Sequence, residues 1–148
     1  MSSFSFMDLA LQAAADAATA GEVPIGCVIV LNGEVIATAG NRTIRDNDPT
    51  AHAEVLAIRQ AAGRLGSQRL GDCDLYVTLV PCTMCAGAIS FARIRRLYFG
   101  AADPKGGGVD SGVRFFAQPT CHHAPDVYSA VGEGEAASLL RDFFKERR

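Results

Sequence analysis

The chain has 148 residues, of which 49% are hydrophobic and 20% are charged, and its formal net charge is −2. This length suits a single domain over residues 1–148, and the hydrophobic content excludes a disordered chain. The slightly acidic balance argues against a general nucleic-acid-binding protein, although it leaves room for a local basic patch.

No apolar run approaches the roughly 18 residues that a membrane span requires, so we expect no membrane partner. The five cysteines are an odd number, and Asp8 and Asp16 interrupt the apolar residues near the N-terminus. No basic segment typical of a secretory signal precedes them. We therefore expect a reducing cytoplasmic location, where a Cys-x-x-Cys motif indicates metal or redox chemistry rather than a disulfide.

A mostly buried helix is predicted over residues 5–20, because Ser5 and Asp8 match a capping box and Gly21 provides a stop. A buried strand is predicted over the apolar residues 25–31. The Asn32-Gly33 pair that follows is a strong hairpin signal, and it predicts a returning strand over residues 34–39.

After a polar loop over residues 41–48, a helix is predicted over residues 51–65 with Thr50 as its N-cap. Residues 74–80, 82–92 and 96–100 then predict strand, helix and strand, a unit whose two strands run parallel. The remaining predicted segments are a glycine-rich loop over 101–112, a short helix over 113–116, a strand over 126–130 and a helix over 135–147.

Pro81-Cys82-Thr83-Met84-Cys85 follows a predicted strand and opens a predicted helix. This placement puts both sulfurs on one face of the first helical turn, where the helix dipole favours ionisation of both thiols. Two thiolates are half of a tetrahedral zinc shell. The motif therefore predicts half of a metal site.

His52 and Glu54 lie in the predicted first turn of the earlier helix. If the two helices pack side by side, His52, Cys82 and Cys85 supply three zinc ligands and leave the fourth position to water, as is typical of a catalytic site. Glu54 is better placed to reach that water than to bind the metal, and it is the expected proton carrier.

A structural zinc site is the alternative, because Cys121, His122 or His123 could provide a fourth protein ligand. Taken alone, the cysteine pair could also be two buried thiols, and the histidine and glutamate a capped helix start. Glu54 favours the catalytic interpretation, because a structural site has no use for a carboxylate beside a ligand. Cys27 and Cys73 are expected to be small buried hydrophobic residues.

The combined His-x-Glu and Pro-Cys-x-x-Cys pattern is the signature of zinc nucleobase deaminases. The chain resembles the cytidine deaminase-like superfamily at these residues, and within it the bacterial tRNA-specific adenosine deaminases. The resemblance extends over segments 22–26, 40–42, 48–54, 75–79, 81–88, 92–94 and 142–144.

The resemblance implies an α/β fold with three layers, α/β/α, around a five-stranded mixed sheet, and a homodimer. It implies hydrolytic deamination of the wobble adenosine to inosine in a tRNA anticodon stem-loop, with one Zn²⁺ per subunit. Glu54 would carry the proton to the purine N1 and help ammonia leave. Asn41 would hydrogen-bond the purine, and the backbone N–H of Ala53 would contact the base edge.

The chain departs from the family pattern at Val80, where the family usually has glutamate, and at Ala102, where a basic residue is common. Neither position binds the metal, so we expect zinc binding to persist. The first change removes a side chain that could orient the site. Loss of such a contact lowers metal affinity or activity roughly 10–100-fold. The second weakens the case for a phosphate contact at that position.

Expected RNA contacts lie in the glycine-rich loop, in the histidine pair and in the C-terminal tail, because aromatic and basic side chains hold splayed-out bases. These candidates are Asp103, Lys105, His122, His123, Phe143, Phe144, Lys145, Arg147 and Arg148. Each set also has a purely structural interpretation. The histidines could be ordinary polar groups of a loop, one phenylalanine could pack in the core, and the basic tail could be a solvated helix end. The cluster Arg93, Arg95 and Arg96 is expected at a dimer or helix–strand edge.

Two other functions stay open at this level. A deaminase of a free base or nucleoside, such as guanine or cytosine, could use the same fold and metal site without a basic tail. A structural zinc module that binds RNA would instead close the metal shell with a fourth protein ligand.

Overall fold

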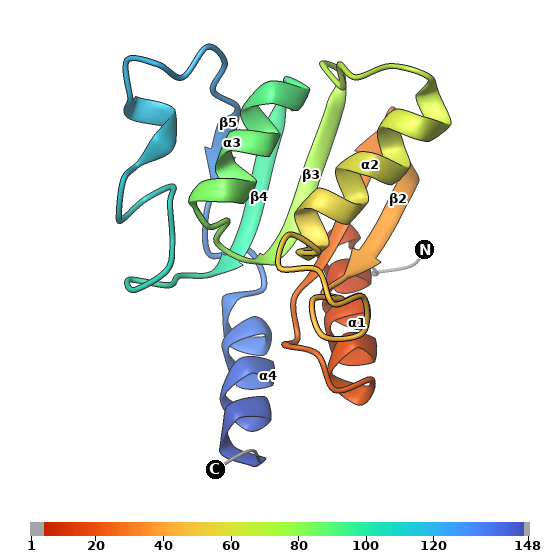
Figure 1. Cartoon of the computed structure of the whole chain (residues 1–148), viewed down its shortest axis with the longest axis vertical. Helices are drawn as coiled ribbons and strands as arrows, with labels where there is room; N and C mark the ends of the chain where they lie inside the picture. Colours follow the sequence, from red (N-terminus) through yellow and green to blue (C-terminus); the bar gives the residue numbers. More distant parts are fainter. Residues whose placement is uncertain (1–4, 147–148) are drawn as a thin grey trace.

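The computed structural model describes residues 5–146, so Arg147 and Arg148 lie outside the described part of the chain. Within it, the strands form a five-stranded sheet in the order β2-β1-β3-β4-β5 (Figure 1). β1 pairs antiparallel with β2 and β3, whereas β4 pairs parallel with β3 and β5. The strands are β1 (Gly26–Leu31), β2 (Glu34–Gly40), β3 (Cys73–Leu79), β4 (Arg96–Ala101) and β5 (Asp126–Tyr128).

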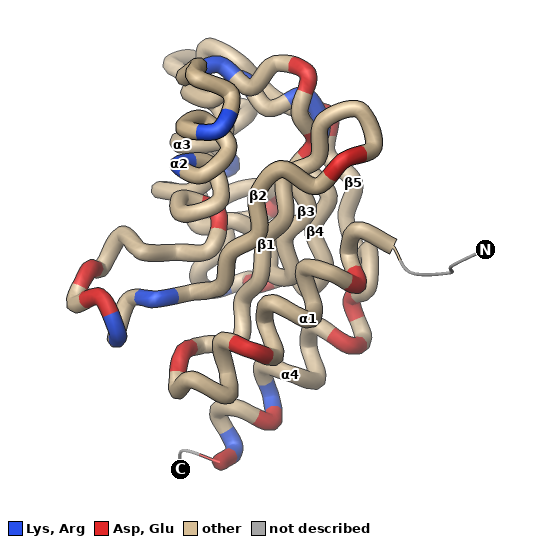
Figure 2. Tube along the Cα trace, turned by 90° about the vertical axis from the view of Figure 1, so that its right-hand side faces the viewer, with Lys and Arg blue, Asp and Glu red and all other residues tan. Residues whose placement is uncertain are grey.

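Helices cover both faces of this sheet, and the edge-on view separates the layers (Figure 2). α2 (Ala53–Leu65) and α3 (Thr83–Ala92) pack on one face, while α1 (Phe6–Thr19) and α4 (Glu133–Glu146) pack on the other. The expected three-layer α/β/α fold with a mixed sheet is therefore confirmed.

α1 begins with the predicted capping box: the Ser5 hydroxyl accepts a hydrogen bond from the Asp8 N–H at 3.1 Å, and the Asp8 carboxylate accepts one from the Ser5 N–H at 2.8 Å. The face of α1 that carries small residues, including Ala10 and Ala14, is fully buried against the sheet. A Cβ atom at Gly26 in β1 would lie 1.9 Å from the Ala10 carbonyl oxygen. Glycine is therefore required there for α1 to approach the sheet so closely.

The predicted N-cap at Thr50 is wrong, because α2 begins at Ala53 with His52 as its N-cap. The Asp48 carboxylate accepts hydrogen bonds from the Thr50 N–H at 2.8 Å and from its hydroxyl at 2.7 Å. This local contact holds the preceding residues in a turn, which competes with helix formation. His52 consequently has an extended backbone conformation at the very start of the helix.

The later elements differ from prediction by a few residues. The short helix is a 3-10 turn at Phe115–Ala117, which starts two residues later and ends one residue later than predicted. β5 stops at Tyr128, and Ala130 adopts a left-handed backbone conformation with φ of 60° that cannot extend the strand. α4 starts two residues earlier than predicted, at Glu133.

The larger core cluster lies between the sheet and the α2/α3 layer and includes Ile29, Leu75 and Ile89. Cys27 and Cys73 are buried in it, as predicted. Arg95 pairs with Asp74 at 2.9 Å where α3 leads into β4, which confirms the expected helix–strand edge.

No helix within residues 5–146 combines the length and the apolar character that a bilayer crossing demands.

Candidate active site

The N-terminal ends of α2 and α3 bring together three potential metal ligands. His52 is the N-cap of α2, Cys82 is the N-cap of α3, and Cys85 lies in the first turn of α3. The Nδ1 atom of His52 lies 3.6 Å from Sγ of Cys82 and 3.5 Å from Sγ of Cys85. All three ligand atoms lie within 4.8 Å of one another.

These separations fit a tetrahedral zinc ion. Zinc–sulfur bonds of about 2.3 Å and zinc–nitrogen bonds of about 2.0–2.1 Å at a tetrahedral angle place the two ligand atoms about 3.5 Å apart. The two measured nitrogen–sulfur distances are 3.5 and 3.6 Å. The backbone thus holds the donors at zinc geometry, and the residues present fit the metal.

The expected fourth protein ligands lie elsewhere, so the structural zinc alternative is contradicted within the described residues. Nε2 of His123 lies 2.7 Å from the Ile94 carbonyl oxygen, and Cys121 lies beside Ser90 near the C-terminal end of α3. The metal ligands lie at the other end of this 10-residue helix, a length of about 15 Å. Three protein ligands with one open position are typical of a catalytic zinc site.

The two thiols share a proton unequally. A hydrogen bond from Cys85 lowers the pKa of Cys82 to about 5, and His52 contributes to this shift. The same hydrogen bond, together with burial and the Glu54 charge, raises the pKa of Cys85. Two thiolates side by side repel each other, so a bound cation favours the ionised form of both.

Glu54 occupies the first turn of α2 and is 4% exposed. Burial raises the pKa of its carboxyl to about 7, and the negative charge of Cys82 adds to the rise. A carboxyl whose pKa lies near neutrality can both accept and donate a proton, which is what a proton carrier requires.

Asn41 is buried at the end of β2, and its side chain reaches the first turn of α2. Its Oδ1 atom accepts a hydrogen bond from the Ala53 N–H at 2.8 Å. Its amide Nδ2 has no hydrogen-bond partner among residues 5–146 and can donate to a ligand. The predicted contact between the Ala53 N–H and a base would have to share this donor with Asn41.

The glycine-rich loop is packed against the metal-ligand turn, a relationship that the sequence analysis missed. The Gly108 N–H donates to the Pro81 carbonyl oxygen at 2.9 Å. A Cβ atom at Gly108 would lie 2.7 Å from the Thr83 nitrogen. The three consecutive glycines at 106–108 were the available signal for a close backbone approach.

Of the expected RNA contacts in this region, Asp103 and Phe144 line one cavity of about 340 Å³. The Asp103 carboxylate also accepts hydrogen bonds from the Lys105 and Gly106 N–H groups, while the Lys105 side chain is exposed. Phe143 is buried and Phe144 is 50% exposed, so one phenylalanine packs in the core, as expected. His122 and His123 lie on the segment beside the far end of α3.

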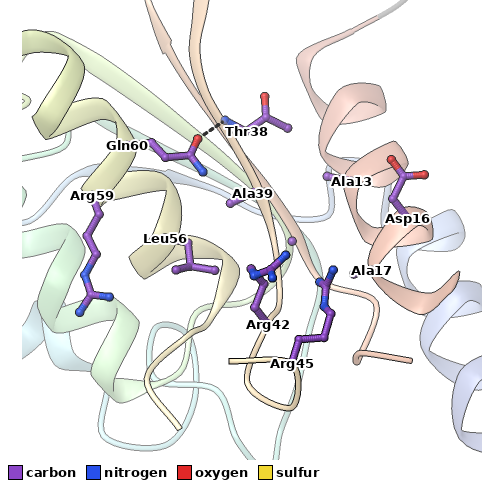
Figure 3. Close-up of a pocket in the computed structure, with 11 residues that line it drawn as sticks. Ala13, Asp16, Ala17, Thr38, Ala39, Arg42, Arg45, Leu56, Arg59 and Gln60 are labelled. Carbon is purple, nitrogen blue, oxygen red and sulfur yellow. Dashed lines mark hydrogen bonds between the residues drawn. The ribbon is translucent and has the colours of Figure 1, made fainter. Parts of the chain in front are cut away.

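A cleft of about 470 Å³ is lined by residues of α1, of the end of β2, of α2 and of the loop that follows β2 (Figure 3). Arg42 and Arg45 extend from this loop beside Leu56, and Arg59 comes from α2. Arg42 pairs with Asp46, whereas Arg45 pairs with Glu22. Glu22 is completely buried, and no local sequence signal marked it as a functional residue.

Comparison with known proteins adds independent information. Residues 2–101 match the family model of the cytidine and deoxycytidylate deaminase zinc-binding region. The tRNA-specific adenosine deaminase of Agrobacterium fabrum is 66% identical over 143 residues, which cover 97% of this chain and 94% of that protein.

Two solved structures are also similar. One, from biochemical and structural studies of A-to-I editing by tRNA:A34 deaminases at the wobble position of transfer RNA, is 67% identical with a TM-score of 0.90, covering 91% of this chain and 98% of that one. A guanine deaminase from Bacillus subtilis is 33% identical with a TM-score of 0.68, covering 98% and 95% of the two chains.

Proposed function

The chain belongs to the tRNA-specific adenosine deaminases of the cytidine deaminase-like zinc enzymes, and we propose that it converts the wobble adenosine of a tRNA anticodon to inosine. The reaction is hydrolytic: water replaces the amino group at C6 of the purine, and ammonia leaves. The observation that carries the deamination chemistry is the set of three ligands at zinc geometry beside a buried carboxyl group, and the 66% identity to a tRNA-specific adenosine deaminase supports the tRNA substrate.

His52, Cys82 and Cys85 hold the zinc ion, one per subunit. When bound, the metal supplies Lewis-acid activation of water. The protein's own contribution is to hold three ligands in fixed directions and to leave one position for water.

Glu54 moves the protons in this proposal. Its carboxylate accepts a proton from the attacking water, delivers it to N1 of the purine and assists the departing amine. Its burial supports this role, because a shielded carboxyl group keeps a pKa near neutrality.

Asn41 orients the base, since its free amide N–H groups can donate to the purine ring. The backbone N–H of Ala53, which donates to Asn41 Oδ1, is proposed to contact the edge of the same base. Asp103, Lys105 and Phe144 are proposed to contact the nucleotides around the target base, which is consistent with the cavity that Asp103 and Phe144 share. His122 and His123 lie at the far end of α3, so any RNA contact they make is outside the base pocket.

A deaminase of a free base such as guanine is the second candidate, favoured by the 33% identity to the Bacillus subtilis guanine deaminase. The 66% identity to a tRNA-specific adenosine deaminase is twice as high. The exposed Phe144 and the basic end of α4 are also unnecessary for a free base, whereas they suit a nucleic acid.

We further infer a homodimer in the cytoplasm. Phe91 on α3 is 73% exposed, and the exposed Met84 lies on the same helix. The two residues are seven positions apart, so they lie on the same face of the helix, and an exposed apolar patch is typical of a protein–protein contact. A second copy of the chain is the partner that the family resemblance implies.

Metal analysis combined with an inosine assay on a minimal anticodon stem-loop tests the function. The expected result is one zinc per subunit and inosine only at the wobble position. Glu54→Gln should retain zinc and form no inosine. A zinc-loaded protein that releases ammonia from guanine or cytosine, and forms no inosine in any anticodon stem-loop, would instead support the free-base alternative.

A further inference from the structure

Glu22 is a fully buried carboxylate between α1 and β1, and it does not belong to the site described above. Its Oε1 atom accepts a hydrogen bond from the Ile44 N–H at 3.1 Å. Its Oε2 atom accepts one from the Arg45 N–H at 2.8 Å and one from the Arg45 Nε at 3.1 Å. One carboxylate therefore fixes both the backbone and a side chain of the loop that follows β2.

Arg45 passes this contact on to Asn41. Its Nη2 atom donates to the Asn41 carbonyl oxygen at 2.8 Å, while its Nε atom stays on Glu22. This use of two guanidinium nitrogens on two different acceptors depends on the fixed fork geometry of arginine. Figure 3 shows Arg45 extending from the loop toward the end of β2.

Asn41 in turn connects the loop to the catalytic helix. Its backbone N–H donates to the Ile25 carbonyl oxygen at 3.1 Å, and its Oδ1 atom accepts from the Ala53 N–H at 2.8 Å. Ala53 lies between the ligand His52 and the proton carrier Glu54. A continuous chain of hydrogen bonds therefore runs from the Glu22 carboxylate through Arg45 to Asn41, and from Asn41 to the first turn of α2.

The ionised form of Glu22 depends on this loop conformation. Burial by itself would raise the pKa of Glu22, but the N–H groups of Arg45 and Ile44 lower it below its usual value. A buried charge that loses its donors is costly. The loop therefore has one strongly favoured arrangement, and the direction of the Asn41 side chain is set with it.

We propose that Glu22 and Arg45 are positioning residues that hold Asn41 in the orientation in which its amide meets the purine. The inference rests on the proposed function, because it assigns Asn41 to the base. Neither Glu22 nor Arg45 touches the reacting atoms, so both act only through the loop.

A double-mutant cycle between Glu22→Gln and Asn41→Ala tests the proposal. Glu22→Gln keeps the side-chain shape but turns an amide NH₂ toward an N–H donor. It should lower kcat/KM for the anticodon stem-loop by about 10- to 100-fold, because a misplacement of about 1 Å can cost 100-fold. Asn41→Ala should lower kcat/KM at least as much as Glu22→Gln does. The double variant should be no slower than Asn41→Ala, since Glu22 acts through the side chain already removed.

Thr78→Val is the matched control. Thr78 is buried, and its Oγ1 atom accepts a hydrogen bond from the Gly26 N–H at 3.1 Å, so the variant also orphans a buried donor. It should lower the Tm as Glu22→Gln does, yet leave kcat/KM per zinc-loaded subunit within about twofold. This comparison separates positioning from a general loss of stability.

Arg45→Lys repeats the test if Glu22→Gln fails to fold. It keeps the positive charge but cannot reach Glu22 and Asn41 with one planar fork, so it should lose activity and show the same non-additivity with Asn41→Ala. Multiplicative losses in the cycle, or full activity in both single variants, would overturn the proposal. If the wild-type protein forms no inosine but deaminates a free base, the proposed function fails, and the same cycle on that base still decides the positioning role.

Discussion

Nδ1 of His52 lies 3.5 Å from Sγ of Cys85, the separation of two ligands on one tetrahedral zinc ion, although the two residues are 33 positions apart in the chain. The contact joins the first residues of two helices that pack on the same face of the sheet. Because the backbone fixes both helix ends, the metal geometry is built into the fold.

Replacing Cys85 with serine should therefore abolish zinc retention, because a hydroxyl is a much poorer ligand than a thiolate. Metal content measured after dialysis against a mild chelator checks this. Cys73→Ser is a suitable control, since Cys73 is also buried but belongs to the core rather than to the metal site. Equal zinc loss in both variants would show that the effect is not specific to the ligand.

Glu54→Gln should separate metal binding from catalysis. The amide preserves the side-chain shape but cannot carry the proton, so inosine formation should fall by about 10²–10⁴-fold. Zinc content should stay at the wild-type level, because Glu54 is outside the ligand set. Substantial activity in a fully zinc-loaded variant would remove Glu54 from its proposed role.

Gly108→Ala should weaken zinc retention although Gly108 is not a ligand. The added methyl group would lie 2.7 Å from the Thr83 nitrogen, so the turn that carries Cys82 must shift. Gly63→Ala is the matched control: no atom lies within 4 Å of the added group, and alanine is the better helix former at that position in α2. Chelator titration of both variants measures the difference, and identical curves would contradict it.

Replacing the two adjacent phenylalanines of α4 should affect different properties, stability for Phe143 and RNA binding for Phe144. Phe143 is buried, so Phe143→Ala should lower the free energy of unfolding by about 3–5 kcal/mol. Phe144 is half exposed, so Phe144→Ala should change stability little but weaken binding of a labelled anticodon stem-loop. Thermal unfolding and fluorescence anisotropy provide the two readouts, and unchanged RNA affinity would exclude Phe144 as a contact.

The contribution of Glu22 to stability should depend on pH. Its pKa in the folded protein is lowered from the usual 4.5, despite burial, by the N–H donors of Arg45 and Ile44. Its stabilisation is therefore complete above the unfolded value and is lost as the pH falls through the folded one. The difference in unfolding free energy between the wild type and Glu22→Gln should shrink from about pH 5 downward. A difference in unfolding free energy that stays constant with pH would contradict the stabilising role of the ionised Glu22 carboxylate.

Whereas the three-layer fold was expected from the family resemblance, the amino-acid sequence by itself determined the hairpin at Asn32-Gly33, the strand–helix–strand unit over residues 74–100 and the identities of the ligands and Glu54. These features are encoded locally, by helical spacing, by turn chemistry and by donor types that only certain metals accept. The N-cap of α2 was placed wrongly because the Asp48–Thr50 contact, also local, competes with the helix start.

Only the tertiary structure decided the remaining features of the site. Glu22 reaches Ile44 and Arg45 across 22 and 23 positions, and Ser90 holds His123 at the far end of α3 across 33. Gly108 likewise meets Thr83 only because the loop folds back on the metal-ligand turn. Such contacts arise from the packing of segments that are distant in the chain, and no short-range pattern records which pair will meet.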